Sequence, residues 1–428
     1  MPCKLALLFA CHAAIAMLSK QKAYQDPAAG AANLVLRLGV LVLTVGTPCA
    51  AVVSRRLLFV LMPVGAVLML IGAFLQPGAV ERLQRHLATA VGSPILLASV
   101  FLLAWTGLSL LWTPYVDLAI ERYIKTLGTA LLVGVGVAAL PDHIRASNSN
   151  LVSIGTAAAS LAIIIVAFVA PQVVRATDPD GTTLQRATIG VVVLLWPALN
   201  ALVLRDRIAS AGSLAIVASV AVALVWTPMA LVALIVGLLT FSLAVSNPTV
   251  TGRVLGGFVA LLILLAPLIP IVFSPLLPNR IDPNGLAALL FDWGTVVRSE
   301  GLRLVTGHGF DAAIRALVAG ILPPRTPRGL LFDVWYELGV TGAAALAALF
   351  WFAFQSAARF GRNMAPFALA ALASVCGIGI SGLAGAQLWW MTLLAIVALT
   401  FAIVLRGQFS TERVQAQVVA TKRPRITA

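Results

Sequence analysis

The sequence is short of charge: only 10% of its 428 residues are Asp, Glu, Lys or Arg, whereas 61% are hydrophobic. Soluble domains carry about 25% charged residues, so this composition excludes an ordinary water-soluble fold. Cysteine and histidine are also scarce, with four of each. The cysteines form no CxxC pair and the histidines are dispersed, which argues against a metal cluster or a redox pair. We therefore expect no metal and no cofactor.

What the chain has in quantity is long apolar runs. Its mean hydropathy is +1.02, and residues 258–273 read FVALLILLAPLIPIVF. Helical segments of roughly 20 apolar residues cross the ~30 Å hydrocarbon core of a bilayer. A transmembrane β-barrel would instead show short alternating segments. The sequence therefore predicts an all-α, polytopic integral membrane protein in which 1–428 form a single transmembrane domain.

Thirteen apolar segments are candidates for spanning helices, and several of them are short. Arg55 and Arg56 fall on the outer side under strict alternation, so we expect one of the first three segments to be re-entrant or interfacial. The expected count is about 12 transmembrane helices, within a range of about 11 to 13. The candidate segments are 4–18, 34–53, 57–76, 93–112, 125–141, 150–172, 188–204, 212–225, 229–246, 254–274, 330–356, 364–384 and 386–405.

One long polar interval, 275–329, interrupts the apolar series and contains two amphipathic stretches near 286–297 and 312–321. If this loop lies outside, the inner connections and tail hold 15 Lys and Arg, and the outer short connections hold 7. Cytoplasmic loops collect cations, so we expect a periplasmic loop and a basic cytoplasmic tail, 406–428, in a bacterial inner membrane. The formal charge of +14 is then explained by the membrane, without nucleic acid.

Charged residues gather where the long loop meets the next apolar segment. Asp333 and Glu337 are four residues apart and share one helix face. Acidic residues at the mouth of a spanning helix are costly unless they are paired or face a wet cavity, so they are functional candidates, with a structural ion pair as the alternative. Arginines facing outward suit phosphate recognition, and a surface that binds lipid headgroups is the competing explanation. The loop residues concerned are Arg303, His308, Arg325 and Arg328.

Two ordered motifs carry a resemblance to a known family. Residues 307–310 read GHGF and residues 333–342 read DVWYELGVTG, while residues 108–114 read LSLLWTP and are followed by AIERY at 119–123. GHGF resembles the Gly-x-Gly-Phe turn of the O-antigen ligase and polymerase-like family, and DVWYELGVTG resembles its Glu-Leu-Gly-x-x-Gly helix. LSLLWTP resembles the family's Ser-x-x-Trp-Ser-Pro element, and AIERY resembles the helix after it. Arg186 beside Gly190 is similar to the family's periplasmic arginine between two central helices.

The resemblance implies an inverting, metal-independent glycosyltransferase that moves a glycan from a polyprenyl-pyrophosphate carrier to a sugar hydroxyl. A ligase would use lipid A core as acceptor, and a polymerase of the same family would use another glycan. The partners would be this donor, this acceptor and membrane lipids. The implied pyrophosphate-binding residues are Arg186, Arg328, Arg325 and Arg303, and the implied motif residues are Gly307, Gly309, Glu337, Gly339 and Gly342.

The chain departs from the family's pattern at the expected base. Arg328-Gly329 stands where the family usually has His-Asn, and arginine stays protonated, so it cannot accept a proton. Three interpretations remain open: Asp333 or His308 replaces the base, arginines alone support the transfer, or the chain has another acceptor or no activity. A transporter or flippase is the alternative from a different class. It would require an inverted repeat, of which the sequence gives no convincing sign.

Overall fold

The computed structural model of the chain describes residues 27–169, 181–273, 285–299, 301, 303–382 and 388–407. Helices make up 84% of it and these residues contain no strand, so the all-α prediction is confirmed. Ten helical segments of the described part are long and apolar enough to cross a bilayer, and two shorter apolar helices accompany them. The chain is therefore a multi-pass membrane protein. The candidate segment 4–18 and most of the tail 406–428 lie outside the described residues, and the exact count of spans stays a prediction.

The apolar helices follow one another through the whole described chain. In order they are α2 (Pro27–Leu41), continued by the π-helix η1 (Val42–Gly46) and α3 (Thr47–Val53), then α4 (Arg55–Phe74), α6 (Pro94–Leu108) with the 3₁₀ turn η2 (Ser109–Leu111), α7 (Val116–Ala139), α8 (Ala146–Val169), α10 (Thr182–Val203), α11 (Ile208–Val225), α12 (Pro228–Ser246), α13 (Pro248–Leu264), α18 (Leu330–Ala358), α19 (Ala365–Ile380) and α20 (Leu388–Leu405).

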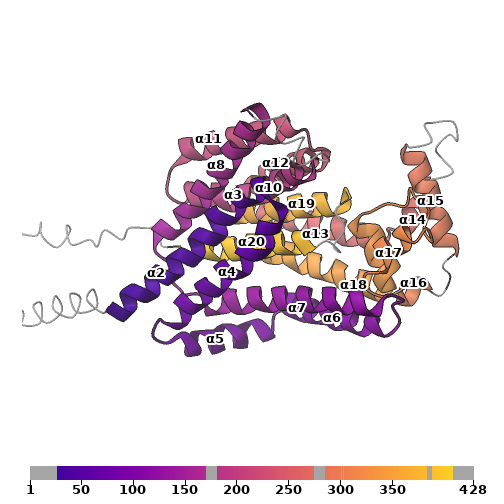
Figure 1. The fold of residues 1–428 in the computed structure, drawn as a ribbon, viewed down its shortest axis with the longest axis horizontal. Helices are drawn as coiled ribbons and strands as arrows, with labels where there is room; N and C mark the ends of the chain where they lie inside the picture. The colour runs from indigo at the N-terminus through magenta and orange to yellow at the C-terminus, as the bar shows by residue number, and fades with distance from the viewer. Residues whose placement is uncertain are drawn as a thin grey trace, which may run out of the picture.

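Five shorter helices make up the rest of the helical structure in the described part of the chain. They are α5 (Ala79–Val91), α14 (Leu268–Phe273), α15 (Leu286–Ser299), α16 (Arg303–Thr306) and α17 (Ala312–Val318). The last four gather at one end of the bundle, which we call the loop end (Figure 1). Helices α15 and α17 overlap the two amphipathic stretches near 286–297 and 312–321 of the long loop.

The first described helix begins, and the last one ends, at the end of the bundle away from the loop end (Figure 1). The Gln76 side chain, just after α4, donates to the Asn33 side chain near the start of α2, 3.4 Å away. The guanidinium of Arg406, just after α20, donates to the Leu140 carbonyl that follows α7, at 2.5 Å. The described chain therefore begins and ends on the side opposite α15, α16 and α17 (Figure 1).

Several helices begin where the sequence carries a polar cap followed by proline. The Ser93 hydroxyl accepts a hydrogen bond from the Leu96 amide at 3.3 Å, and the Asn247 side chain accepts one from the Val250 amide at 3.2 Å. Such caps satisfy amide groups that the first helical turn leaves without partners, and proline in that turn removes a further one. Helices α6 and α13 therefore start at positions that the local sequence determines.

Two expected boundaries are wrong. The candidate 254–274 is not one helix, because α13 ends at Leu264 and α14 begins at Leu268, with Pro267 between them. Proline lacks the amide hydrogen that a continuous helix needs. Helix α7 starts at Val116, nine residues before the candidate 125–141, because its first turns carry charged residues that lowered the apparent hydropathy.

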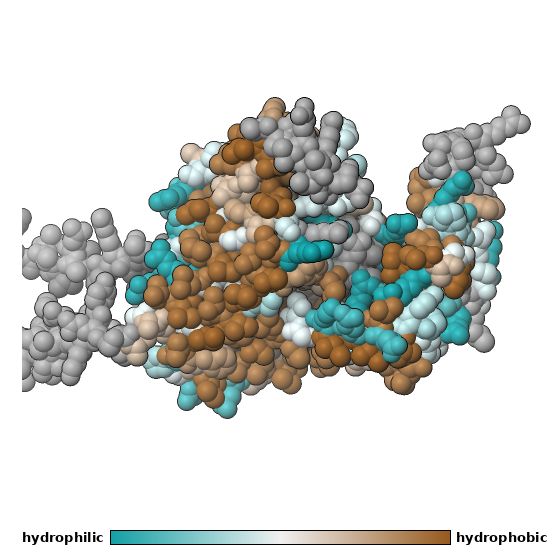
Figure 2. All heavy atoms as spheres, viewed as in Figure 1, coloured by the Kyte–Doolittle hydropathy of each residue, from teal (hydrophilic) through white to brown (hydrophobic). Residues whose placement is uncertain are grey.

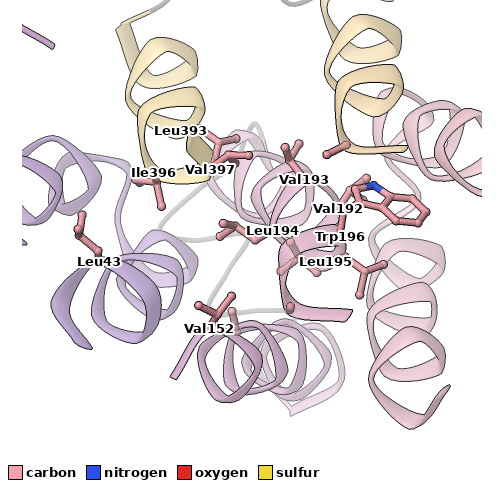
Figure 3. Packing of buried hydrophobic residues seen from close by; sticks show 14 of the residues in the cluster. Leu43, Val152, Val192, Val193, Leu194, Leu195, Trp196, Leu393, Ile396 and Val397 are labelled. Carbon is pink, nitrogen blue, oxygen red and sulfur yellow. The ribbon is translucent and has the colours of Figure 1, made fainter. Parts of the chain in front are cut away.

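Helix α10 forms the centre of the larger hydrophobic core. Its most apolar stretch is 83% buried, far more than that of any other spanning helix of the described chain. Leu194 packs between η1, α8 and α20, whereas Trp196 points away from these helices, toward α12 (Figure 3). The Trp196 indole donates to the Ser374 hydroxyl of α19 at 2.9 Å, and this hydroxyl donates to the Ala233 carbonyl of α12 at 2.9 Å. These bonds join three helices and give the Trp196 indole N–H a hydrogen-bond partner inside the apolar core.

The outer side of the bundle is apolar. Phe101 of α6 and Leu131 of α7 are 51% and 58% exposed, which is an unfavourable arrangement in water and a favourable one against lipid tails. Figure 2 shows hydrophobic residues covering most of this side of the bundle, while hydrophilic residues concentrate toward its two ends. This distribution is the one expected for a protein that spans a membrane along its long axis.

Close contact between α8 and η1 depends on Gly155. A Cβ atom at this position would lie 1.8 Å from the Thr44 carbonyl oxygen. Gly155→Ala should therefore destabilise the protein by about 1–3 kcal/mol, because the two helices must separate. Unfolding temperatures of the purified protein in detergent test this prediction. Gly134→Ala in α7 is the control, since no atom lies within 4 Å of its Cβ position, and it should leave stability unchanged or slightly raised. Equal unfolding temperatures for both variants would contradict the prediction.

Candidate functional site

The turn at 307–309 is bonded to a break in α18. Helix α18 has non-helical backbone at Gly339, where φ is +65°, so carbonyl groups just before this residue lose their partners within the helix. Other segments replace those partners. The His308 amide donates to the Tyr336 carbonyl at 2.8 Å, the Gly309 amide donates to the Glu337 carbonyl at 2.9 Å, and the Trp105 indole donates to the Leu338 carbonyl at 2.9 Å. The loop thus completes the hydrogen bonding of a discontinuous membrane helix.

Glycine is required at this junction because the two backbones are in contact. A Cβ atom at Gly307 would lie 2.2 Å from the Glu337 carbonyl oxygen, and one at Gly339 would lie 2.3 Å from the Val305 carbonyl oxygen. Both glycines also have positive φ, which other residues adopt at a cost. The motif glycines at 307 and 339 therefore serve one structural purpose, which is the close approach of the loop to α18.

The second sequence motif contacts the first. The Phe310 amide donates to the Ser109 hydroxyl at 3.1 Å, and the Thr113 hydroxyl donates to the Phe310 carbonyl at 3.1 Å. A Cβ atom at Gly309 would lie 2.6 Å from the Thr113 Cα atom. Segments that are about 200 residues apart in the sequence are thus packed together at the loop end.

A buried ion cluster follows directly on this turn. The Asp311 side chain is fully buried, and its two carboxylate oxygens accept hydrogen bonds from two guanidinium groups. One is Nη1 of Arg122 in α7, and the other is Nε of Arg315 in α17, at 2.7 Å. Ionised groups bonded in this way are held firmly when water is excluded. Asp311 therefore fixes two arginines from two helices beside the turn.

Next to this cluster lies a cavity of about 280 Å³, which we call the arginine cavity. Arg122, Arg186 and Arg328 line it together with Asp333, whose side chain is almost fully buried at 8% exposure. Within the described residues, the Asp333 carboxylate accepts no hydrogen bond and forms no ion pair. The remaining lining residues are Ala313, Ile314, Leu317, Leu322, Thr326, Pro327 and Phe332. The cavity therefore combines three cationic donors with one carboxylate.

Arg186 also borders an apolar cleft between α3, α4, α10 and α20. Its guanidinium carbon lies 5.3 Å from the ring centre of Trp389, a cation–π distance. Ala51, Gly190 and Leu393 are among the residues that line this cleft. Arg186 thus lines both the arginine cavity and this apolar cleft.

A second cavity, of about 390 Å³, lies beside the arginine cavity and shares Leu322 with it. His308 faces this second cavity and stacks on Tyr336, with ring centres 4.1 Å apart and planes 11° apart. Tyr115 of the Trp-Thr-Pro-Tyr segment lies on the same wall. The second cavity is therefore lined mainly by aliphatic residues and prolines, with two tyrosine rings, His308 and two further hydroxyl groups.

The structure brings together some of the expected site residues and separates others. Arg186, Arg328 and Asp333 meet in the arginine cavity, whereas His308 lines the neighbouring one. Arg303 lines a small hollow with His308 and Tyr336, away from the other arginines. Arg325 is exposed and does not line the arginine cavity, so the expected grouping of all four arginines is not found.

The remaining motif residues have structural positions. Glu337 is buried, and its Oε1 atom accepts a hydrogen bond from the Ala313 amide at 3.3 Å. Gly342 lies against the Leu338 side chain, since a Cβ atom there would be 2.1 Å from the Leu338 Cβ.

Sequence reasoning assigned no role to Arg122, and it counted Asp311 among the charged residues of the long loop without a role of its own. The signal for Asp311 was its position directly after the GHGF turn, and the signal for Arg122 was its place within AIERY, one of the segments that carried the resemblance.

Comparison of the chain with models of known protein families, with curated proteins and with solved structures found no match. The arrangement of the site therefore has to be interpreted from its own geometry and chemistry.

Gly309 offers a test of the contact between the two motifs. Gly309→Ala should destabilise the loop end, because its Cβ would overlap Thr113 and its φ of +96° disfavours alanine. The expected loss is about 2–4 kcal/mol, with faster protease cleavage between α15 and α18. Gly320→Ala is the matched control: its φ is +72°, but its Cβ would meet nothing within 4 Å. If both variants lose the same stability, backbone strain alone is responsible and the proposed contact is unimportant.

Proposed function

We propose that this chain is a membrane glycosyltransferase of the O-antigen ligase-like type. It transfers a glycan from a polyprenyl-pyrophosphate carrier to a sugar hydroxyl, on lipid A core or on another glycan, at the periplasmic side of a bacterial inner membrane. The observation that carries the proposal is the arginine cavity, in which Arg122, Arg186 and Arg328 surround one space together with Asp333.

Three guanidinium groups suit a pyrophosphate leaving group. When the bond between the sugar and the pyrophosphate breaks, negative charge builds up on the departing oxygen, and fixed cationic donors stabilise that charge. Guanidinium groups bind phosphate oxygens through paired hydrogen bonds. In this proposal the arginines supply the positive charge, so the transfer needs no divalent metal.

The position of Arg186 supports a lipid-linked donor. This side chain lines the charged cavity and also the apolar cleft that contains Gly190 and Leu393. A polyprenyl pyrophosphate has the same division, with a charged head joined to a hydrocarbon chain. The excess of Lys and Arg in connections at the opposite end supports a periplasmic loop end.

The chemistry of the transfer requires one bond to form and one to break. The acceptor hydroxyl oxygen attacks the anomeric carbon from the face opposite the pyrophosphate, the carbon–oxygen bond to the pyrophosphate breaks, and the configuration inverts. The hydroxyl proton passes to a base as the new bond forms. Asp333 is the base in this proposal, because it shares the cavity with the arginines and its carboxylate has no protein partner among the described residues. His308 faces the neighbouring cavity instead.

Removal of Arg186 tests the role of the cavity. Arg186→Ala should reduce transfer from a polyprenyl-pyrophosphate glycan by at least about 100-fold, since a cationic donor to the leaving group is lost. The measurement is product formation by purified protein in lipid nanodiscs, with lipid A core and free glycan as alternative acceptors. Arg325→Ala is the matched control and should keep transfer within about twofold, because this exposed arginine lies outside the cavity. No transfer by the wild type to either acceptor, with normal surface glycan in a deletion strain, would overturn the proposal.

The assignment of the base has a separate test. Asp333→Asn should lower kcat by about 10²–10⁴ and change the KM for the donor little, because the amide keeps the shape and cannot accept the proton. His308→Gln should lower kcat far less. The two variants should be compared over a range of pH in the same transfer assay. If His308→Gln removes the activity while Asp333→Asn keeps it, the base lies in the second cavity.

A further inference from the structure

Asp311 directly precedes α17, at the N-cap position, but its side chain does not cap that helix. Its backbone is left-handed, with φ of +65°, and its side chain is fully buried. An aspartate that precedes a helix usually accepts a hydrogen bond from an amide of the first turn. The Asp311 side chain accepts none. A buried carboxylate that does not cap its helix must be stabilised by other groups.

The cap of α17 comes from another helix. The Ala313 amide, in the first turn of α17, donates to Oε1 of Glu337 in α18. Glu337 therefore takes over the bond that Asp311 would normally make. As a result, neither carboxylate oxygen of Asp311 is needed to cap α17, and each is bonded to an arginine.

The two arginines have different surroundings. Arg122 lines the arginine cavity, and its side chain is 18% exposed. Arg315 does not line that cavity, and its side chain is 31% exposed. A guanidinium group has five N–H donors, so the bond from Nη1 of Arg122 to Asp311 leaves other donors for a ligand.

We propose that Asp311 is a positioning residue that holds Arg122 in place for binding a pyrophosphate group in the arginine cavity. The carboxylate restricts Arg122 to one of its many rotamers and balances the charge of a second nearby arginine. A ligand then binds a guanidinium whose conformational entropy is already reduced. The inference takes the identity of the ligand from the proposed function and adds the mechanism by which the site is assembled.

Binding of inorganic pyrophosphate to the full-length protein in nanodiscs tests this inference. Asp311→Asn removes the charge, and asparagine tolerates left-handed backbone well, so the turn is preserved. Asp311→Asn and Arg122→Ala should each weaken pyrophosphate binding by about tenfold or more. Asp311→Asn in the Arg122→Ala background should add no further loss, because the effect of Asp311 passes through Arg122. Equal losses in both backgrounds would overturn the inference.

Two further variants separate positioning from general destabilisation. Arg315→Gln removes the other partner of the same carboxylate and should leave pyrophosphate affinity within about twofold. Arg122→Lys keeps an ion pair with Asp311, so folding is protected, but an ammonium lacks the fixed fork of donors and should bind pyrophosphate about tenfold more weakly. A lysine variant that binds like the wild type would contradict the inference, and so would a wild type without pyrophosphate binding.

The binding assay also separates this inference from the proposed function. If the wild type binds pyrophosphate and the variants lose affinity as expected, but the wild type transfers no glycan, the proposed function alone is overturned. A wild type that transfers glycan while Asp311→Asn binds pyrophosphate normally would overturn the positioning role alone.

Discussion

The loop end depends on one constraint, which is that carbonyl groups freed by the break of α18 at Gly339 must find partners inside a membrane protein. An unpaired carbonyl in an apolar region costs several kcal/mol, so a broken spanning helix persists only where other groups complete its hydrogen bonds. The His308 and Gly309 amides and the Trp105 indole do so. The loop is therefore attached to α18 by the same bonds that make the break possible.

The positions of the charged residues follow from this attachment. Because Gly309 is bonded to α18 and Phe310 is bonded to Ser109, the residue that follows, Asp311, is held between α7 and α18. Its carboxylate then reaches Arg122, and Glu337, from the helix segment before the break, supplies the cap of α17. The arginine cavity is thus a consequence of where the turn is fixed, and a small shift of the turn would move several of its walls.

Sequence reasoning succeeded for features that repeat along the chain and was weaker for features that depend on contacts between distant segments. Apolar runs predicted the all-α, multi-pass fold, because long apolar segments directly reflect which parts of the chain meet lipid or core. The boundary at Leu264 was missed although Pro267 is visible in the sequence, since the surrounding residues are uniformly apolar. Arg186 was selected through the family resemblance, Arg328 as a loop arginine and Asp333 as an acidic residue at the mouth of a helix. Their meeting in one cavity could not be inferred from spacing. Arg122 was missed because its partner, Asp311, lies 189 residues away.

The balance of charge in the site favours an anionic ligand. The ion cluster and the arginine cavity together contain four arginines, Arg122, Arg186, Arg315 and Arg328, and three carboxylates, Asp311, Asp333 and Glu337, so the formal sum is +4 − 3 = +1. Two of the carboxylates have structural bonds, Asp311 to two arginines and Glu337 to the Ala313 amide. Asp333 alone is left for the cavity, against three guanidinium groups that line the same space. This net positive charge favours an anion as the ligand of the cavity. An anion bound there would contact these guanidinium groups and lie in the same cavity as the Asp333 carboxylate.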